Sequence, residues 1–438
     1  MQEQINAILS QPQLARAHWG LDVVELESGK VIYSLNPDQL FLPASNAKLF
    51  TTAAVLAAAG PDYHFRTTVE SSGKLDDHGR LQGDLVIVGR GDPNISGRVM
   101  PFQVKTERVP PHTQALEEMA DQVAHSGLKI VDGDIVGDDT FYAAQRYAEG
   151  WAQDDLQWID GAPVSALSFN DNVVFININP GEHPGDKALV TQETPSNYYE
   201  LDNRIVTTAA GTARKVGVHR AIGSKKIVFW GSIPLGDAGM KEPLAIEDPA
   251  EYTAQLFREM LERRGIRING KTRARHGEIA QFYDQSPAQE PAAATEAKRP
   301  RCCMVAEPAP EPQPATTPQP GATPISAAPP QVLAEHVSLP LTEDVRVINK
   351  TSQNLHAEMA LRLVGNLAGT GPSFEGGAAA VKQFLLQAGL KEDEFVLLDG
   401  SGLSRRDLVT PAAVAHLLIY ASRQPWGAAY EDSLPVSA

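Results

Sequence analysis

Apolar and polar residues alternate along residues 19–37, which read WGLDVVELESGKVIYSLNP. A period of two is typical of strands with one buried face, and the central Ser28-Gly29 pair is typical of a tight turn, so this segment predicts a β-hairpin. The alternation then stops. Residues 45–59 are rich in alanine and other apolar residues and end at Gly60-Pro61, which predicts a helix that is buried on most sides.

Short alternating segments follow over residues 66–245, and they predict a strand-rich region with one helix at 112–127. Residues 246–264 predict a further helix. Between residues 287 and 330 lie 12 of the 32 prolines, mixed with Ala, Gln, Thr and Glu. Such a composition cannot bury a core, and it predicts a disordered linker.

The C-terminal part again predicts helices. One apolar stripe has a spacing of four residues: Leu355, Met359, Leu363 and Leu367. Residues 374–389 predict another helix, and residues 394–407 predict a short strand and a tight loop. Thr410-Pro411 then predicts the start of a last helix, because threonine is a frequent N-cap and proline is favoured in the first turn.

Composition narrows the function classes. The 438 residues are 42% hydrophobic and 21% charged, as in ordinary globular proteins, and a net charge of −16 argues against nucleic acid or an anionic membrane as a partner. No apolar run is long enough for a transmembrane span, and the first residues do not resemble a signal peptide. The two cysteines, Cys302 and Cys303, are adjacent, so neither a disulfide framework nor a metal site is expected.

Ser45 and Lys48 stand three residues apart at the start of the predicted buried helix. Taken alone, this spacing fits an ordinary helix cap followed by a surface lysine. Here, however, the helix dipole favours negative charge on the serine, and its lysine lies on the same face in an apolar setting. Desolvation would lower the pKa of that amine, so the pair predicts a serine nucleophile with a lysine base.

Such a site needs a further hydroxyl and amide, and two Ser-x-Asn triplets could supply them. Ser168 and Asn170 precede a predicted strand, whereas Ser352 and Asn354 lie in a loop that opens a helix. A loop between helices can project both side chains into a cleft. The second triplet is therefore preferred, with a helix cap as the alternative for Ser352.

Six segments together resemble one family. They are PASNAKLFTTAAVLAAAG, VGRGDPNIS, GDIVGDDTFY, GAPVSALSFNDN, SQNLHAEMALRLVG and DGSGLSRRDLVTP, in chain order. In this order they are similar to the low-molecular-mass penicillin-binding proteins of the D-alanyl-D-alanine carboxypeptidase/endopeptidase family, peptidase family S13. The resemblance runs from about residue 5 to the C-terminus, without the proline-rich insert.

The resemblance implies an α+β fold. Its transpeptidase-like domain, an antiparallel sheet with helices, would be interrupted by two β-rich domains. The expected transpeptidase-like parts are residues 1–66, 246–286 and 336–438, and the expected linker is 287–335. Inserted domain II would comprise 67–97 and 166–245, and inserted domain III would comprise 98–165.

The resemblance also implies roles. Ser45 would attack the carbonyl of a D-Ala–D-Ala bond or a peptide cross-link, Lys48 would take its proton, Ser352 would relay a proton to the leaving amine, and Asn354 would hold the substrate amide. The partners would be peptidoglycan stem peptides and, as covalent inhibitors, β-lactam antibiotics. No cofactor is expected, and the location would be the periplasm.

Two further positions match a substrate pocket of that family. Asp155 in GWAQDD and Arg405 in GSGLSRR would read the ammonium and carboxylate of a diaminopimelyl side chain. The alternative for each is an exposed surface charge.

The third family motif, Lys-Thr-Gly, is absent. Lys271-Thr272 is followed by arginine and Lys350-Thr351 by serine. We therefore expect a chain truncated before the strands that complete the central sheet, with impaired activity. The alternative is a non-catalytic relative that binds peptidoglycan or β-lactams.

Overall fold

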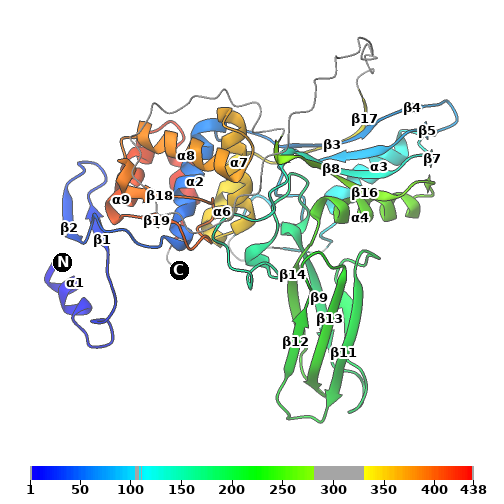
Figure 1. The fold of residues 1–438 in the computed structure, drawn as a ribbon, viewed down its shortest axis with the longest axis horizontal. Helices are drawn as coiled ribbons and strands as arrows, with labels where there is room; N and C mark the ends of the chain where they lie inside the picture. The colour runs from blue at the N-terminus through cyan, green and yellow to red at the C-terminus, as the bar shows by residue number, and fades with distance from the viewer. Residues whose placement is uncertain (1, 104–107, 110, 281–329, 437–438) are drawn as a thin grey trace, which may run out of the picture.

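A computed structural model describes residues 2–103, 108–109, 111–280 and 330–436. It is a mixed α+β structure in which helices gather on one side and strands on the other, as Figure 1 shows. A second group of strands extends below the first, and a small N-terminal hairpin lies beyond the helices.

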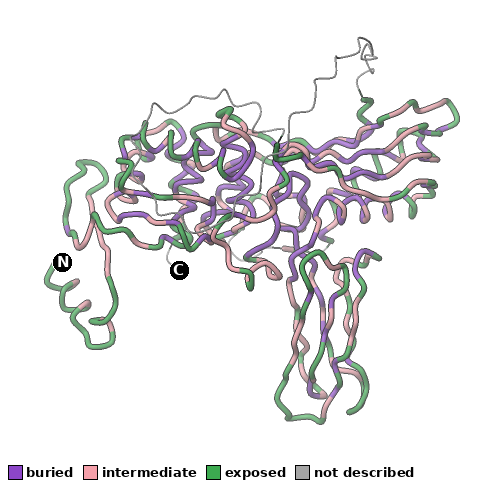
Figure 2. Tube along the Cα trace, in the orientation of Figure 1, coloured by how far each residue is buried: buried purple, intermediate pink, exposed green. Residues whose placement is uncertain are grey.

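The helical lobe forms around α2, whose residues Ala47–Ala59 carry alanines, Phe50, Val55 and Leu56 into the core. Five further helices surround it: α6 (Leu341–Thr351), α7 (Asn354–Ala368), α8 (Phe374–Gln387), α9 (Pro411–Ser422) and α10 (Gly427–Ser433). Buried residues are dense in this lobe (Figure 2). As expected, the Thr410 hydroxyl caps α9 by accepting from the Ala413 amide.

The upper β-lobe is built on a five-stranded sheet in the order β16-β8-β6-β3-β17. Its strands are β16 (Thr272–Gly277), β8 (Ile135–Ala143), β6 (Leu85–Val88), β3 (Arg66–Ser71) and β17 (Gln331–Val337). A four-stranded sheet, β15-β7-β5-β4, continues this layer with β15 (Arg267–Ile268), β7 (Ile130–Val131), β5 (Arg80–Gln82) and β4 (Lys74–Leu75). Helices α3 (Gln114–His125) and α4 (Pro249–Arg263) pack against the strands.

The lower group of strands forms two three-stranded sheets. One is β10-β9-β14, with β10 (Leu189–Gln192), β9 (Val173–Asn179) and β14 (Met240–Ala245). The other is β11-β13-β12, with β11 (Glu200–Thr208), β13 (Lys226–Pro234) and β12 (Lys215–His219). Inward-facing residues of both sheets, including Ile176, Ile205 and Phe229, join the core of the upper lobe.

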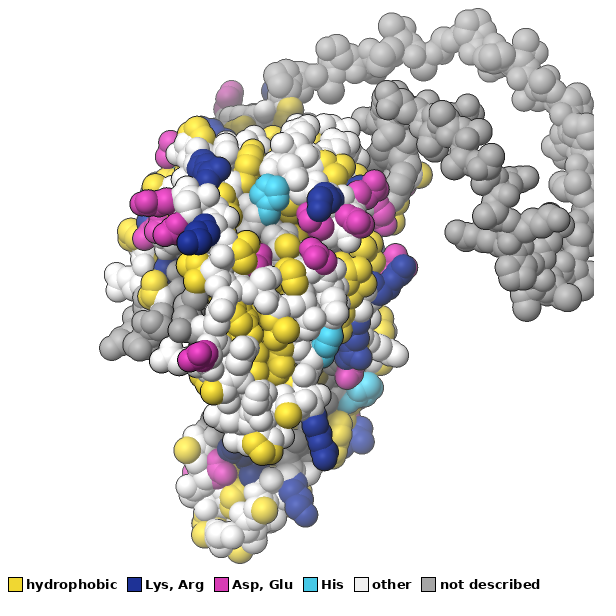
Figure 3. All heavy atoms as spheres, turned by 90° about the vertical axis from the view of Figure 1, so that its left-hand side faces the viewer, with side chains coloured by type: hydrophobic (Ala, Val, Ile, Leu, Met, Phe, Trp, Pro, Cys, Tyr) yellow, Lys and Arg dark blue, Asp and Glu magenta, His cyan; other side chains and the backbone are white. Residues whose placement is uncertain are grey.

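The predicted hairpin is present as β1 (Leu21–Val24) paired antiparallel with β2 (Val31–Leu35), preceded by α1 (Gln2–Leu9). Within the described residues this sheet has only these two strands. A groove of about 610 Å³ beside it is lined by apolar side chains of the hairpin and of α9, among them Trp19, Leu21, Val414 and Leu418. Figure 3 looks onto this side and shows hydrophobic side chains across its middle. A second pair of short strands, β18 (Phe395–Val396) and β19 (Leu408–Val409), lies nearby.

Strand pairing corrects the predicted domain boundaries. Strand β8 was assigned to inserted domain III, yet it pairs with β6 in the same sheet. Residues 246–277 were assigned to the transpeptidase-like domain, but α4 and β16 pack on β8 and belong to the upper β-lobe. Periodicity along the chain marks strands and helices but carries no information about their partners, so these boundaries were placed wrongly.

The predicted linker at 287–335 also needs correction at its end. Residues 287–329 lie outside the described residues, but Gln331–Val337 form β17, which pairs with β3. The high proline content upstream obscured this strand, whose residues VLAEHV alternate only weakly.

We expect the hairpin to have the weakest protection against hydrogen exchange. In β1 and β2 only Tyr33 is buried, whereas β6 is buried along Leu85–Ile87 and flanked by paired strands on both sides. Local opening costs least where few apolar contacts must break. Exchange measured by mass spectrometry should be faster in residues 21–35 than in residues 85–88. Equal protection would contradict this expectation.

Candidate active site

The short helix η1 (Ala44–Asn46) leads into α2 and places Ser45 at the surface, while Lys48 one turn later is only 2% exposed. Lys48 is buried because α2 packs across α7, and the described chain crosses it again at residues 399–402. The sequence expectation of a lysine at the start of a buried helix is therefore met.

The four principal candidates converge on one point. Lys48 Nζ lies 3.2 Å from Ser45 Oγ and 2.7 Å from Asn354 Oδ1. The Ser352 hydroxyl lies 2.6 Å from Ser45 Oγ. The Asn354 amide nitrogen donates to the Asp160 carbonyl at 3.0 Å, which leaves its oxygen facing the lysine. Residues that are 307 positions apart thus share one hydrogen-bonded cluster.

Burial lowers the pKa of Lys48 from 10.5 to about 8, and the negative charges of Glu358, Asp399 and Asp160 oppose this effect. The shift corresponds to roughly 3 kcal/mol of differential stabilisation of the neutral amine. Near pH 8 a substantial fraction of the amine is therefore deprotonated and can accept a proton from Ser45.

The turn between α6 and α7 presents the second pair. Ser352 ends α6 in the left-handed conformation (φ 59°, ψ 39°), and α7 begins at Asn354. Ser352 is exposed and Asn354 is half-buried, while Gln353 between them points inward and is 7% exposed. Ser352 and Asn354 both line a cavity of about 560 Å³, as predicted for a loop between helices.

The sequence did not reveal two groups that hold Lys48. The Ser401 carbonyl accepts from Lys48 Nζ at 2.7 Å. The buried Glu358 carboxylate in turn accepts from the amides of Gly400 and Ser401 at 2.9 and 2.8 Å. Burial, with Asp399 nearby, raises the pKa of Glu358 to about 8. Glu358 follows Asn354 by four residues, so it lies on the same helix face, and this was the available signal.

The 399–402 turn approaches the residue before Ser45 closely at Gly402. This residue has φ +79°, and a Cβ there would lie 1.8 Å from the Ala44 carbonyl oxygen. Ala44 itself adopts a left-handed conformation (φ 46°) immediately before Ser45. Only glycine allows this contact between the two turns.

The first Ser-x-Asn triplet lies elsewhere. Ser168 is fully buried, and its hydroxyl donates to the Asn172 side chain at 3.0 Å. Asn170 Nδ2 donates to the Val173 carbonyl, and residues 170–172 form a left-handed turn rather than strand. Among the described residues no hydrogen bond or ion pair joins this triplet to Ser45, which agrees with the preference for Ser352 and Asn354.

Asp155 and Arg405 lie on loops beside the cluster. The Arg405 amide donates to the Gly150 carbonyl at 3.3 Å, so its loop touches the loop that carries Asp155. Arg405 is exposed and Asp155 is half-buried, and among the described residues no ion pair joins them. Their substrate roles remain proposals.

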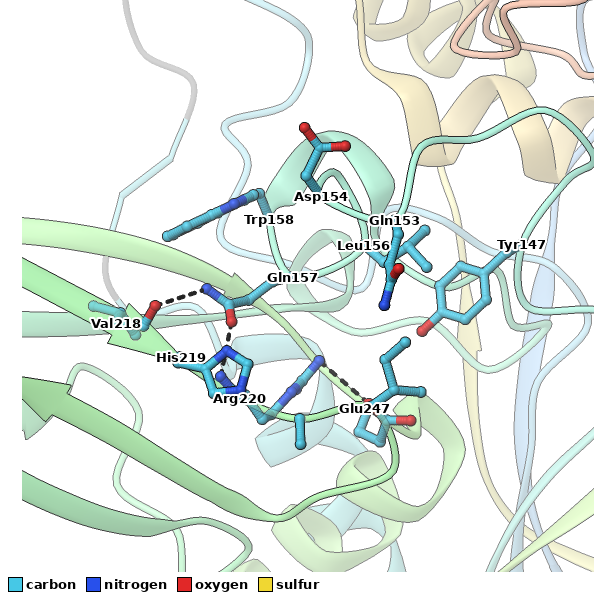
Figure 4. Close-up of a pocket in the computed structure, with 12 residues that line it drawn as sticks. Tyr147, Gln153, Asp154, Leu156, Gln157, Trp158, Val218, His219, Arg220 and Glu247 are labelled. Carbon is cyan, nitrogen blue, oxygen red and sulfur yellow. Dashed lines mark hydrogen bonds and ion pairs between the residues drawn. The ribbon is translucent and has the colours of Figure 1, made fainter.

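A separate cavity of about 720 Å³ lies between residues 147–158 and the end of β12 (Figure 4). Gln157 crosses it, donating to the Val218 carbonyl and accepting from the Arg220 amide at 2.7 Å. Its lining includes Asp154 and Leu156 but neither Asp155 nor any residue of the Ser45 cluster. These contacts fix one side of the Asp155 loop.

Comparison with known proteins identifies the family. The model of the D-Ala-D-Ala carboxypeptidase 3 (S13) family matches residues 1–281 and 321–438. The chain belongs to this family. A D-alanyl-D-alanine carboxypeptidase of Actinomadura sp. (strain R39) is 32% identical over 443 residues, which cover 100% of this chain and 70% of that protein. DacB of Haemophilus influenzae is 23% identical, over 92% of this S13 chain and 71% of the relative.

Solved structures show the same fold. Penicillin-binding protein 4 (dacB) from Haemophilus influenzae superposes with a TM-score of 0.71 at 22% identity, covering 95% of this chain and 78% of that one. The same relative complexed with a β-lactam gives a TM-score of 0.65 at 20% identity, over 95% and 77% of the two chains.

Metal and membrane features are not found in the described part of this S13 protein. Its described side chains form no cluster of three or more metal-ligating groups. Among the same residues no helix is long and apolar enough to cross a membrane. Neither lysine of the two Lys-Thr pairs contacts Ser45 within the described residues: Lys271 directly precedes β16, and the Lys350 amine donates to the Leu434 carbonyl at 2.8 Å.

Substitution Gly402→Ala should destabilise the helical lobe. The new methyl group would overlap the Ala44 carbonyl, and the positive φ adds roughly 1 kcal/mol of backbone strain. Gly369→Ala is the matched control, because Gly369 has φ +74° but open space around its Cβ position. Thermal unfolding should show a larger fall in Tm for Gly402→Ala, and equal falls would argue against the contact.

Proposed function

We propose that the protein is a serine-type D-Ala-D-Ala carboxypeptidase/endopeptidase that acts on peptidoglycan stem peptides in the periplasm and is acylated by β-lactams. The observation that carries this proposal is the buried Lys48 amine within reach of Ser45 Oγ, beside the Ser352 hydroxyl. Membership of the S13 family and its named carboxypeptidase relatives support the reaction class.

The three contacts of Lys48 suggest how the base works. Two of its partners, Asn354 Oδ1 and the Ser401 carbonyl, carry no proton and can only accept. They therefore occupy two of the hydrogens on the Lys48 amine. A neutral amine has only two hydrogens and one lone pair, so the lone pair faces the longer contact, Ser45 Oγ. The hydroxyl proton can then pass to the amine while the serine oxygen attacks the substrate carbonyl.

The remaining steps use groups around Ser45. The Ser352 hydroxyl, 2.6 Å from Ser45 Oγ, is placed to carry a proton from Lys48 to the leaving amine. In this proposal Asn354 holds the substrate amide, and the Ser45 backbone N–H, in η1 just before α2, stabilises the oxyanion. Water then attacks the acyl-enzyme ester on Ser45 while Lys48 accepts a proton from it, and the C–O bond to Ser45 Oγ breaks as Lys48 returns that proton to the serine oxygen. In this proposal Asp155 and Arg405 read the ends of a diaminopimelyl side chain.

Substitution of Ser45 tests the proposal directly. In the purified protein, Ser45→Ala should abolish covalent labelling by a fluorescent penicillin, and Lys48→Ala should reduce it nearly as far, because an unassisted hydroxyl is a weak nucleophile. Ser373→Ala is the control, since Ser373 caps α8 in the same lobe. Labelling of the Ser45→Ala protein would refute the assignment. Labelling of the unmodified protein without release of D-alanine would favour a β-lactam-binding relative.

The pH dependence should report the pKa of Lys48. The amine must be neutral to accept a proton, so the penicillin acylation rate should rise with pH and level off above a midpoint near 8. Glu358→Gln removes an anion that favours the protonated amine, so the midpoint should move to lower pH. Stopped-flow acylation between pH 6 and 10 measures both profiles. A midpoint that stays in place in the Glu358→Gln protein would show that this carboxylate does not act on the base.

A further inference from the structure

An ionic network centred on the buried Asp171 lies beside the Ser352–Asn354 turn, and its Arg98, Arg108 and Gln353 line the same cavity of about 560 Å³ as Ser352 and Asn354. The Asp171 carboxylate accepts from Gln353 Nε2 at 2.8 Å and lies 3.2 Å from His356 Nε2. It also forms ion pairs with Arg98 and Arg108. We call the set Asp171, Arg98, Arg108, Gln353 and His356 the Asp171 network.

The network joins the β-rich region to the catalytic turn. Asp171 belongs to the 170–172 turn just before β9, and its side chain is completely buried. Gln353 and His356 lie at the start of α7, where the Gln353 side chain also caps the helix by accepting from the His356 amide. One carboxylate from a distant segment therefore contacts both residues that anchor the beginning of α7.

The backbone around Asp171 supports a dedicated role. Residues 170–172 are three consecutive non-glycine residues with positive φ (51°, 56° and 53°). Such conformations cost conformational energy and persist only where surrounding contacts fix them. One such contact is the hydrogen bond that the Asn172 side-chain amide donates to the Pro163 carbonyl at 2.8 Å. The strained turn aims the Asp171 carboxylate at α7.

The geometry of the turn explains what this contact controls. Only Ser352 and Gln353 separate α6 from α7, and the inward Gln353 side chain stands between two residues that face the cleft. A shift of Gln353 would move Ser352 Oγ relative to Ser45 and Asn354 Oδ1 relative to Lys48. We propose that Asp171 is a positioning residue for the acyl-transfer site, acting through Gln353 and His356.

The charges around His356 favour its protonated form within this network. Asp344 of α6 lies 2.6 Å from its Nδ1, and Asp171 lies beyond its Nε2. These two carboxylates raise the pKa of His356 against the effect of burial, and Asp92 is a further carboxylate in electrostatic contact. Arg98 and Arg108 form ion pairs with the Asp171 carboxylate, which also faces His356. The positive charge of His356 and the negative charge of Asp171 therefore stabilise each other.

The test compares two carboxylates that each contact a histidine and an arginine, the buried Asp171 and the partly buried Asp248. Asp248 of the upper β-lobe caps α4, lies 3.0 Å from His276 Nε2 and pairs with Arg146. We expect both Asp171→Asn and Asp248→Asn to lower Tm. Only Asp171→Asn should slow the first-order acylation step by benzylpenicillin, by roughly 10- to 100-fold, because small misplacements of reacting groups have effects of this size.

This inference rests on the proposed function, and the measurements separate the two. If the unmodified protein is not acylated at Ser45, the proposed function fails. If it is acylated and Asp171→Asn reacts at the unmodified rate, or Asp248→Asn slows equally, the positioning role is refuted. Should Asp171→Asn fail to fold, Gln353→Met decides, since it removes the contact to Asp171 and should slow the same step. An unchanged rate in that variant would also refute the role.

Discussion

The structure depends on the burial of one amine. Lys48 is almost inaccessible to water, and a charged ammonium in such a place would cost several kcal/mol without partners. Its three acceptors come from three separate segments, at Ser45, Asn354 and Ser401. Each acceptor limits where its own segment can lie, so the requirement to satisfy this amine fixes the relative positions of α2, α7 and the 399–402 turn.

The surrounding carboxylates set the chemical state of that amine. Burial favours the neutral form, whereas Glu358 and Asp399 favour the cation, and the result is a pKa near 8. Glu358 has a second role because it binds the two backbone amides whose turn offers the Ser401 carbonyl. The same side chain thus orients a partner of Lys48 and tunes the charge of its amine.

The sequence predicted those parts of the site in which the relevant side chains lie close together in the chain. Ser45 and Lys48 share a helix face, and Ser352 and Asn354 flank a helix start, and the structure brings these four side chains together as expected, while their catalytic roles stay a prediction. The sequence could not predict that the Ser401 carbonyl accepts from Lys48, because every residue has a backbone carbonyl and the residue type gives no signal for this contact. It also misplaced the domain boundaries, since β8, β16 and β17 find partners far away in the chain. Asp171 was overlooked because the SFNDN segment was considered only as a rival catalytic triplet.

The pairing of β3 with β17 explains how distant segments can still form one site. Arg66 at the start of β3 pairs with Val337 at the end of β17, so the whole β-rich region enters and leaves the helical lobe at neighbouring positions. Ser338 secures this point, since its hydroxyl accepts from the Phe65 amide at 2.9 Å and its own amide donates to the Phe65 carbonyl at 3.0 Å. Bringing α2 and α6 together otherwise means closing a very long loop, which costs conformational entropy. Once the β-rich region has folded, that closure is already made, and the two halves of the helical lobe meet as if they were joined by a short connection. The region between Ser45 and Ser352 therefore contributes to the candidate active site twice, first through this closure and again through the carboxylate of Asp171 beside the Ser352–Asn354 turn.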